Sequence, residues 1–196
     1  MSLRLAIAAL ALAAAPAFAA PTHYTLDETH TQVVIQWSHL GFSNPTAQFG
    51  KVIGTLEFDP ADPGRSSLDV TIPLSSINTN VPALDEHLQK ADFFDSATYP
   101  EATFKSVKVE SGAGKDRLKV TGDLTLHGQT HPLVLDVTVN KVGTHPMRNV
   151  PAAGFDATTT IRRSQFGIDK YVPGISDDIK VRITVEALGE APAAKD

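Results

Sequence analysis

The chain has 196 residues, no cysteine, and 22 Asp and Glu residues against 17 Lys and Arg residues, which gives a formal net charge of −5. This acidic balance disfavours nucleic acids and anionic membrane surfaces as partners, because both attract basic proteins. The lack of cysteine excludes disulfide bonds and acylation at a lipobox cysteine, so the fold must depend on its apolar core.

The first 19 residues are predicted to be a secretory signal peptide. Arg4 provides a weak basic start, residues 5–15 are apolar, and Ala17-Phe18-Ala19 forms a small-x-small cleavage site. The apolar stretch is shorter than the roughly 20 residues that a membrane-spanning helix needs, although an uncleaved interfacial anchor is the alternative. We therefore expect a periplasmic or secreted protein without an integral membrane segment, with one domain over residues 20–188 and a disordered tail over 189–196.

Alternation of apolar and polar residues dominates the rest of the chain and predicts β-strands. It runs through residues 33–38, 55–59, 68–75, 118–126, 131–140, 155–161 and 179–186. About eight strands with short connections indicate an all-β fold with an antiparallel sheet, either a closed barrel or a two-sheet sandwich. Gly50, Gly54 and Gly122 lie within strand patterns and favour the barrel, since glycine allows a sheet to bend sharply.

Residues 75–104 interrupt this pattern with a single predicted helix. Asn80 is the predicted N-cap, and Pro82 suits the first turn, where a missing N–H costs nothing. Tyr99-Pro100 ends any continuation of the helix, because the residue before a proline avoids the α conformation. One helical face carries the residues to be buried: Leu84, His87, Leu88 and Ala91. Further along, residues 142–154 are predicted to form an irregular loop that rims an opening.

Seven histidines raise the question of a metal site, but their spacing does not support one. No H-x-H pair lies within a strand and no H-E-x-x-H motif is present. His127 and His131 flank a turn and are predicted to lie in a solvated loop. Asp27 and His30 are predicted to organise the turn before a strand. We therefore expect neither a metal ion nor a cofactor.

Sequence motifs of catalysis are also missing from the chain. It has no G-x-S-x-G elbow, no cysteine nucleophile and no glycine-rich loop leading into a helix. We therefore expect a protein that is not an enzyme. The alternative is an enzyme that acts on a lipid or its head group, in which His30, His87 and Arg163 would be the residues to test.

The positive signal is a large set of apolar residues on the inner faces of the predicted strands. A barrel of about eight strands is wide enough either to pack solid or to hold one ligand, so two interpretations remain open. A filled barrel would suit a partner-binding module, and a hollow one a carrier. The residues are Val33, Ile35, Trp37, Leu56, Phe58, Leu68, Val70, Ile72, Phe104, Leu118, Val120, Leu124 and Phe155.

Several runs of residues, in order and spacing, resemble one known family. The most specific are Asp85-Glu86-His87-Leu88, Asp92-Phe93-Phe94-Asp95 and Tyr99-Pro100, which follow an opening Tyr24-Thr25-Leu26-Asp27. They resemble the YceI-like polyisoprenoid-binding proteins over nearly the whole chain after residue 19. One departure is Gln165, where the family commonly has an acidic residue before Phe-Gly.

The resemblance implies a lipocalin-like antiparallel β-barrel with one helix packed against it. Such a barrel would enclose an apolar tunnel for a long-chain polyisoprenoid, an isoprenoid quinone or a similar amphiphilic lipid. The resemblance also implies an exported carrier, often a homodimer. Since the helix interrupts an all-β chain, we expect it to act as a lid, with Leu84, Leu88 and Ala91 inward and with Phe93 and Phe94 closing one end. Arg163, Lys90 and Lys170 are the candidates to meet a polar head group.

Overall fold

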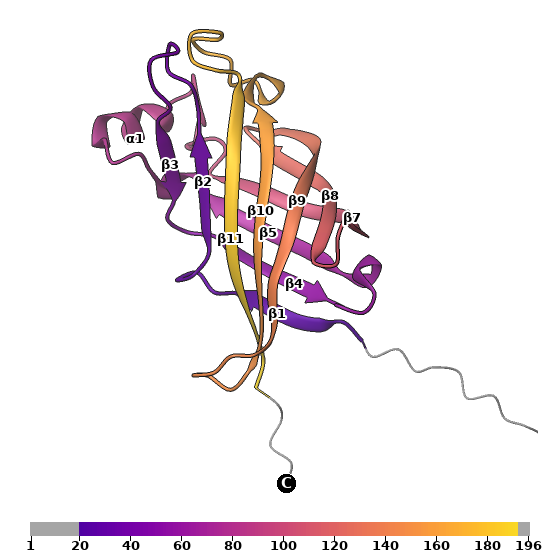
Figure 1. The fold of residues 1–196 in the computed structure, drawn as a ribbon. Helices are drawn as coiled ribbons and strands as arrows, with labels where there is room; N and C mark the ends of the chain where they lie inside the picture. The colour runs from indigo at the N-terminus through magenta and orange to yellow at the C-terminus, as the bar shows by residue number, and fades with distance from the viewer. Residues whose placement is uncertain (1–19, 192–196) are drawn as a thin grey trace, which may run out of the picture.

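The computed structural model describes residues 20–191, so the predicted signal peptide and residues 192–196 of the tail lie outside the described part. An eleven-stranded sheet with one α-helix, α1 (Pro82–Leu88), forms a barrel (Figure 1). The strands are β1 (Thr22–Leu26), β2 (Gln32–Gln36), β3 (Thr46–Phe49), β4 (Ile53–Phe58), β5 (Ser67–Pro73), β6 (Ile77–Asn78), β7 (Glu101–Ser111), β8 (Arg117–Leu126), β9 (Gln129–Thr144), β10 (Pro151–Arg162) and β11 (Asp178–Gly189). Three short 3₁₀ helices are η1 (Pro63–Arg65), η2 (Leu74–Ser76) and η3 (Arg163–Phe166).

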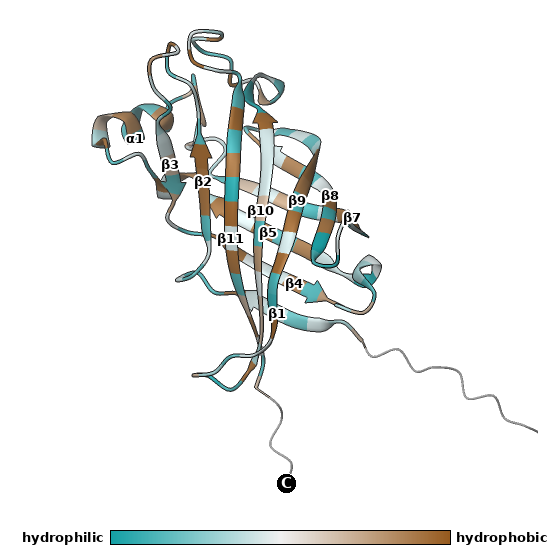
Figure 2. Cartoon of the chain, in the orientation of Figure 1, coloured by the Kyte–Doolittle hydropathy of each residue, from teal (hydrophilic) through white to brown (hydrophobic). Residues whose placement is uncertain are grey.

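Eight strands close the barrel by antiparallel pairing. They follow the order β1-β4-β5-β7-β8-β9-β10-β11, and β11 then pairs again with β1. Apolar and polar residues alternate along the strands, as the bands on β11 in Figure 2 show, and the buried residues of these strands are almost all apolar. The predicted closed antiparallel barrel of about eight strands with one helix is therefore confirmed.

At two positions around the barrel, one long strand is replaced by two shorter ones. The breaks between them distinguish the two ends of the barrel. β11 pairs with β1 through Ala187–Gly189 and with β2 through Lys180–Thr184, so β1 and β2 follow one another along the same neighbour. β4 pairs with β1 while β3 pairs with β2, which repeats the interruption one strand further round. At the β2–β3 end the sheet finishes at β6, whose partner among the described residues is β3.

The predicted helix is present, but two of its details were wrong. Its N-cap is Val81 rather than Asn80, which has a positive φ of 62°. A side chain of the helix stabilises its start. Asp85 Oδ1 accepts from the Thr79 N–H at 2.7 Å and from the Thr79 hydroxyl at 2.6 Å. The helix ends at Leu88, which leaves Ala91 exposed rather than facing the barrel. Among residues 20–191, no helix has the length and apolar character that a membrane crossing requires.

Local sequence signals account for the bends and turns of the sheet. A Cβ added to Gly122 would lie 2.5 Å from the Lys105 carbonyl oxygen, so the close approach of β7 requires glycine there.

Residues 142–154 are not the loop expected at the opening. Most of them belong to the β9–β10 hairpin, whose turn lies at the end opposite η3, and none of them contributes to the barrel cavity described below.

Candidate functional site

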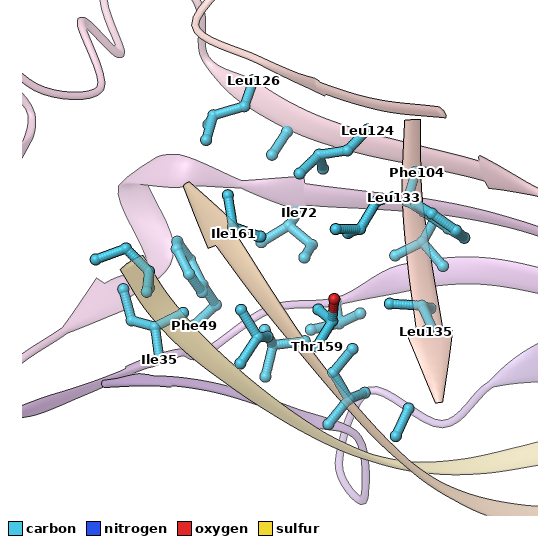
Figure 3. Close-up of a pocket in the computed structure, with 18 of the residues that line it drawn as sticks. Ile35, Phe49, Ile72, Phe104, Leu124, Leu126, Leu133, Leu135, Thr159 and Ile161 are labelled. Atoms are coloured by element: carbon cyan, nitrogen blue, oxygen red, sulfur yellow. The ribbon is translucent and has the colours of Figure 1, made fainter. Parts of the chain in front are cut away.

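The barrel encloses a cavity of about 710 Å³. Its wall consists of the inward side chains of the barrel strands, and Figure 3 shows Ile72, Phe104, Leu124 and Leu135 converging on it. Arg163 is the one Asp, Glu, Lys or Arg residue in the wall, so the lining is almost entirely apolar. The volume lies within the range of about 300–1,000 Å³ that is typical of small-molecule sites. Water in it would find few hydrogen-bonding partners, which favours an apolar occupant.

All seventeen residues predicted to line a tunnel lie in this wall. The helix and the segment after it contribute Leu84, Leu88, Phe93 and Phe94, and the strands and Trp37 contribute the rest. Other wall residues were missing from the predicted set although the same alternation marks them: Leu133, Leu135, Ile161, Ile179, Val181, Ile183 and Val185. Phe49 was also missed, because the short strand β3 carries too little alternation to be recognised.

The segment 79–100, which we call the lid, follows β6 and contacts β3 on one side and the β8–β9 turn on the other. The Phe94 ring lies 6.2 Å from the Phe49 ring of β3, centroid to centroid. At the other side, the Tyr99 ring lies 5.1 Å from the His127 ring in the β8–β9 turn. The Gln89 amide also donates to the Leu74 carbonyl oxygen at 3.0 Å. Side chains of the lid therefore attach it to β3, to η2 and to the β8–β9 turn.

Arg163, predicted to meet a head group, lies in the cavity wall and is also bound to the backbone, so the head-group role stays a prediction. Its guanidinium donates at 2.8–3.0 Å to four carbonyl oxygens, those of Ile168, Lys170, Ile175 and Ser176. The side chain is buried, and this burial lowers the pKa of the guanidinium from its usual value. Four of its five N–H groups are thus occupied in holding the loop 163–177 in shape.

The two lysines predicted to meet a head group lie outside the cavity wall. Lys170 Nζ donates to Asp92 Oδ2 at 2.8 Å, which joins the loop 163–177 to the lid. This pair raises the pKa of Lys170 and lowers that of Asp92. Lys90 is exposed on the lid. A head-group role for these residues stays a prediction.

The histidines do not form a common centre. His127 and His131, predicted in a solvated loop, are half-buried, and both contact Phe166: His127 Nδ1 lies 2.8 Å from its carbonyl oxygen, and the His131 ring packs against its ring. His87 lines the cavity and packs on Phe93, whereas His30 is exposed and outside the wall. The structure therefore does not bring His30, His87 and Arg163 together.

A polar cluster lies at the break between β1 and β2. Asp27 organises this turn as predicted, because its carboxylate accepts from the Thr29 N–H at 2.9 Å and from the Thr29 hydroxyl at 2.6 Å. His30 Nδ1 lies 3.0 Å from the other oxygen. Donor atoms of Asp27, His30 and Glu186 all lie within 4.8 Å of one another, the one such group among residues 20–191. Since the Arg148 guanidinium also lies 3.6 Å from Asp27, the cluster already has a cation.

Comparison with known proteins places the chain in a family. The family model of the YceI-like domain matches residues 24–187. A UPF0312 protein of Pseudomonas syringae pv. tomato is 38% identical over 184 residues, which cover 94% of each chain. Two solved structures share the fold. BcnA of Burkholderia cenocepacia has a TM-score of 0.74 at 25% identity, over 82% of this chain and 98% of its own.

The second is a polyisoprenoid binding domain of Saccharophagus degradans, implicated in plant cell wall breakdown, with a TM-score of 0.68 at 18% identity over 85% of this chain and 98% of its own. At this identity the likeness concerns the fold alone. The family match and the relative at 38% identity extend over most of the sequence. The chain therefore belongs to the YceI-like family.

Proposed function

We propose that this protein is an exported carrier that holds a long-chain polyisoprenoid, an isoprenoid quinone or a similar amphiphilic lipid inside its barrel. The observation that carries the proposal is the cavity of about 710 Å³ with its apolar wall. A filled barrel would have favoured a partner-binding module instead. The shared fold with a domain named for polyisoprenoid binding supports the choice of ligand class.

Burial of the ligand's hydrocarbon is sufficient to account for binding. Each five-carbon isoprene unit that leaves water for a dry cavity contributes on the order of 4 kcal/mol, at about 0.8 kcal/mol for each methylene-sized group. Association and ordering costs must be subtracted from this gross figure. Several units would therefore bind without any polar contact, which fits a wall whose charged residue is already bonded to the backbone.

The test is to identify the lipid and then to block the cavity. Purified protein is extracted with organic solvent, the extract is analysed by mass spectrometry, and uptake of an added prenyl chain is measured. The variant Ala157→Phe places a ring in the cavity, because Ala157 is a wall residue of β10. We expect it to lower uptake at least about tenfold.

Thr160→Phe is the matched control, since Thr160 lies on the same strand but is exposed. It should take up lipid as the unmodified protein does. The absence of bound lipid together with no uptake of added prenyl chains would refute the carrier function. Equal uptake by both variants would show that the lipid binds elsewhere.

Export is the second part of the proposal, and its support is the sequence of residues 1–19. The apolar cargo would then move through an aqueous compartment outside the cytoplasm. Mass spectrometry of the protein from the periplasmic fraction should find a mature N-terminus at Ala20. An intact Met1 in that fraction, or protein confined to the cytoplasm, would contradict this part and leave lipid binding unaffected.

A further inference from the structure

Exposed apolar side chains gather around one end of the barrel. Of the ten large hydrophobic residues that are exposed within residues 20–191, five lie there: Leu40, Phe42, Val81, Tyr171 and Val172. Phe42 is 91% exposed, and Leu40 and Tyr171 are each 57% exposed. The other five are scattered over the outer strand faces and the β9–β10 hairpin. A concentration of this kind on a folded chain indicates an interaction surface.

These residues form one surface because two distant loops are tied together. The loop 37–45 and the loop 171–176 stand side by side at the top of Figure 1. The Leu40 N–H donates to the Gly174 carbonyl oxygen at 2.8 Å, and the Ser176 N–H donates to the Ser38 carbonyl oxygen at 3.0 Å. We call these two loops, together with Val81, the mouth rim.

The mouth rim is continuous with the cavity. Val81 and Tyr171 are exposed and also belong to the cavity wall, as do His39 and Ser43 of the first loop. The exposed Leu40 and Phe42 therefore lie on a loop that borders the cavity. A ligand that leaves through this end passes directly over the exposed apolar surface.

Charge is missing from the same loops. Residues 37–45 and 171–176 contain no Asp, Glu, Lys or Arg, although these residues make up 20% of the chain. At the opposite end, the β9–β10 hairpin carries Arg148 beside Asp27 and Glu186. Charged groups resist transfer into the lipid interface, whereas phenylalanine and tyrosine side chains favour it.

We propose that the mouth rim docks onto the interfacial layer of a lipid bilayer, so that the cavity opens toward the acyl chains. The inference rests on the proposed carrier function, because an apolar cargo would then enter or leave without crossing water. The formal net charge of −5 gives the protein no attraction to anionic head groups. The docking is therefore apolar, and it depends little on salt.

Flotation with phosphatidylcholine vesicles that lack prenyl lipid tests the docking. The double variant Leu40→Ser/Phe42→Ser should weaken vesicle binding at least about tenfold, since two exposed apolar side chains no longer leave water. Met147→Ser is the matched control, because Met147 is 89% exposed on the β9–β10 hairpin. It should bind within about twofold of the unmodified protein. Raising the salt from about 0.1 to 0.5 M should also change binding less than about twofold.

Several outcomes would overturn the docking. They are no vesicle binding by the unmodified protein, an equal loss in the Met147 variant, or a strong loss with salt. Sedimentation velocity tests the alternative that a second copy of this chain covers the mouth rim. If the double variant converts a dimer into a monomer and binds vesicles unchanged, the mouth rim is an interface between two copies of this chain and the proposal is wrong.

The uptake of a prenyl chain that is added from a solution in organic solvent, with no vesicles, tests the proposed function separately from this inference. Retained uptake without vesicle binding would refute the docking alone. Vesicle binding that depends on Leu40 and Phe42, without any uptake, would support the docking and refute the carrier function alone.

Discussion

At one end of the barrel the ring of backbone hydrogen bonds is complete, because β1 is paired on one side with β4 and on the other with β11. The rings of Phe58 and Phe155 meet edge to face inside that end, with centroids 5.2 Å apart. At the other end the sheet stops at β6, and the wall is completed by the lid and by the loop that Arg163 holds.

One end of the barrel is therefore closed by strand pairing and the other, the lid end, by side-chain contacts. A ladder of backbone hydrogen bonds opens only when a strand unfolds, whereas contacts from loops and a short helix open locally at a lower cost. The lid end is therefore where we expect a ligand to pass. Substitutions at the closed end should mainly change stability, and those at the lid should mainly change ligand release.

The largest effect is expected at Arg163, because the loop that completes the wall at the lid end depends on this one side chain. Arg163→Met removes four hydrogen bonds to carbonyl oxygens at a buried site, and we expect it to lower the free energy of unfolding by about 3–5 kcal/mol. Urea denaturation measures the change. Arg163→Lys keeps the charge but not the planar fork, and should lose an intermediate amount. A change below about 0.5 kcal/mol in the Met variant would show that the loop holds its shape without this residue.

A matched pair of phenylalanines compares the ends directly. Phe58→Ala should cost about 3 kcal/mol of stability, because Phe58 is almost fully buried at the closed end. Phe94→Ala should cost about 1 kcal/mol, since Phe94 is half-buried on the lid, but it should speed lipid release about tenfold. Denaturation and a lipid-release assay on both variants give the result. Equal effects of the two substitutions on release would remove the distinction between the ends.

The turn between β1 and β2 predicts a dependence on pH. Hydrogen bonds from the Thr29 side chain, and then from His30 and the Thr29 backbone, outweigh the effect of burial and lower the pKa of Asp27 from 3.8 to about 2. The carboxylate therefore contributes stability above about pH 4, and the contribution is lost as the pH falls toward 2. Asp27→Asn should cost about 1–2 kcal/mol at pH 7, and less at pH 3. Denaturation at several pH values measures this, and a cost that stays constant would contradict it.

The smallest effect is expected at the ion pair of Lys170 and Asp92, which joins the loop 163–177 to the lid. Both side chains are exposed, so water and salt screen the pair and Lys170→Ala should leave the unfolding transition unchanged. Lipid release should change less than in Phe94→Ala, since the lid keeps its contacts with Phe49 and His127. If Lys170→Ala releases lipid as fast as Phe94→Ala, the ion pair holds the lid closed as much as the packing of Phe94 does.

Some parts of the site could be predicted because they depend on local pattern. The alternation through Leu118, Val120 and Leu124 predicted their inward direction, and helical spacing did the same for Leu84 and Leu88. The predicted Asn80 cap was wrong, because the start of the helix is instead held by a contact between Thr79 and Asp85, which no local capping pattern marks. Arg163 is similar, since its partners are backbone carbonyl groups that carry no sequence signal.

Periodicity left a closed barrel and a two-sheet sandwich open, and the family resemblance implied the barrel. The strand faces, the single helix, the antiparallel pairing and the family could be predicted from the sequence alone. These follow from residue periodicity and from residue order, which do not depend on how far apart the walls stand. The cavity inside the barrel, the end closed by the lid and the place of residues 142–154 became known only from the folded structure. A cavity is a small difference between the volume enclosed by the strands and the volume of their side chains, and strand tilt and interruption set the first of these. The same alternating chain could have filled its barrel completely.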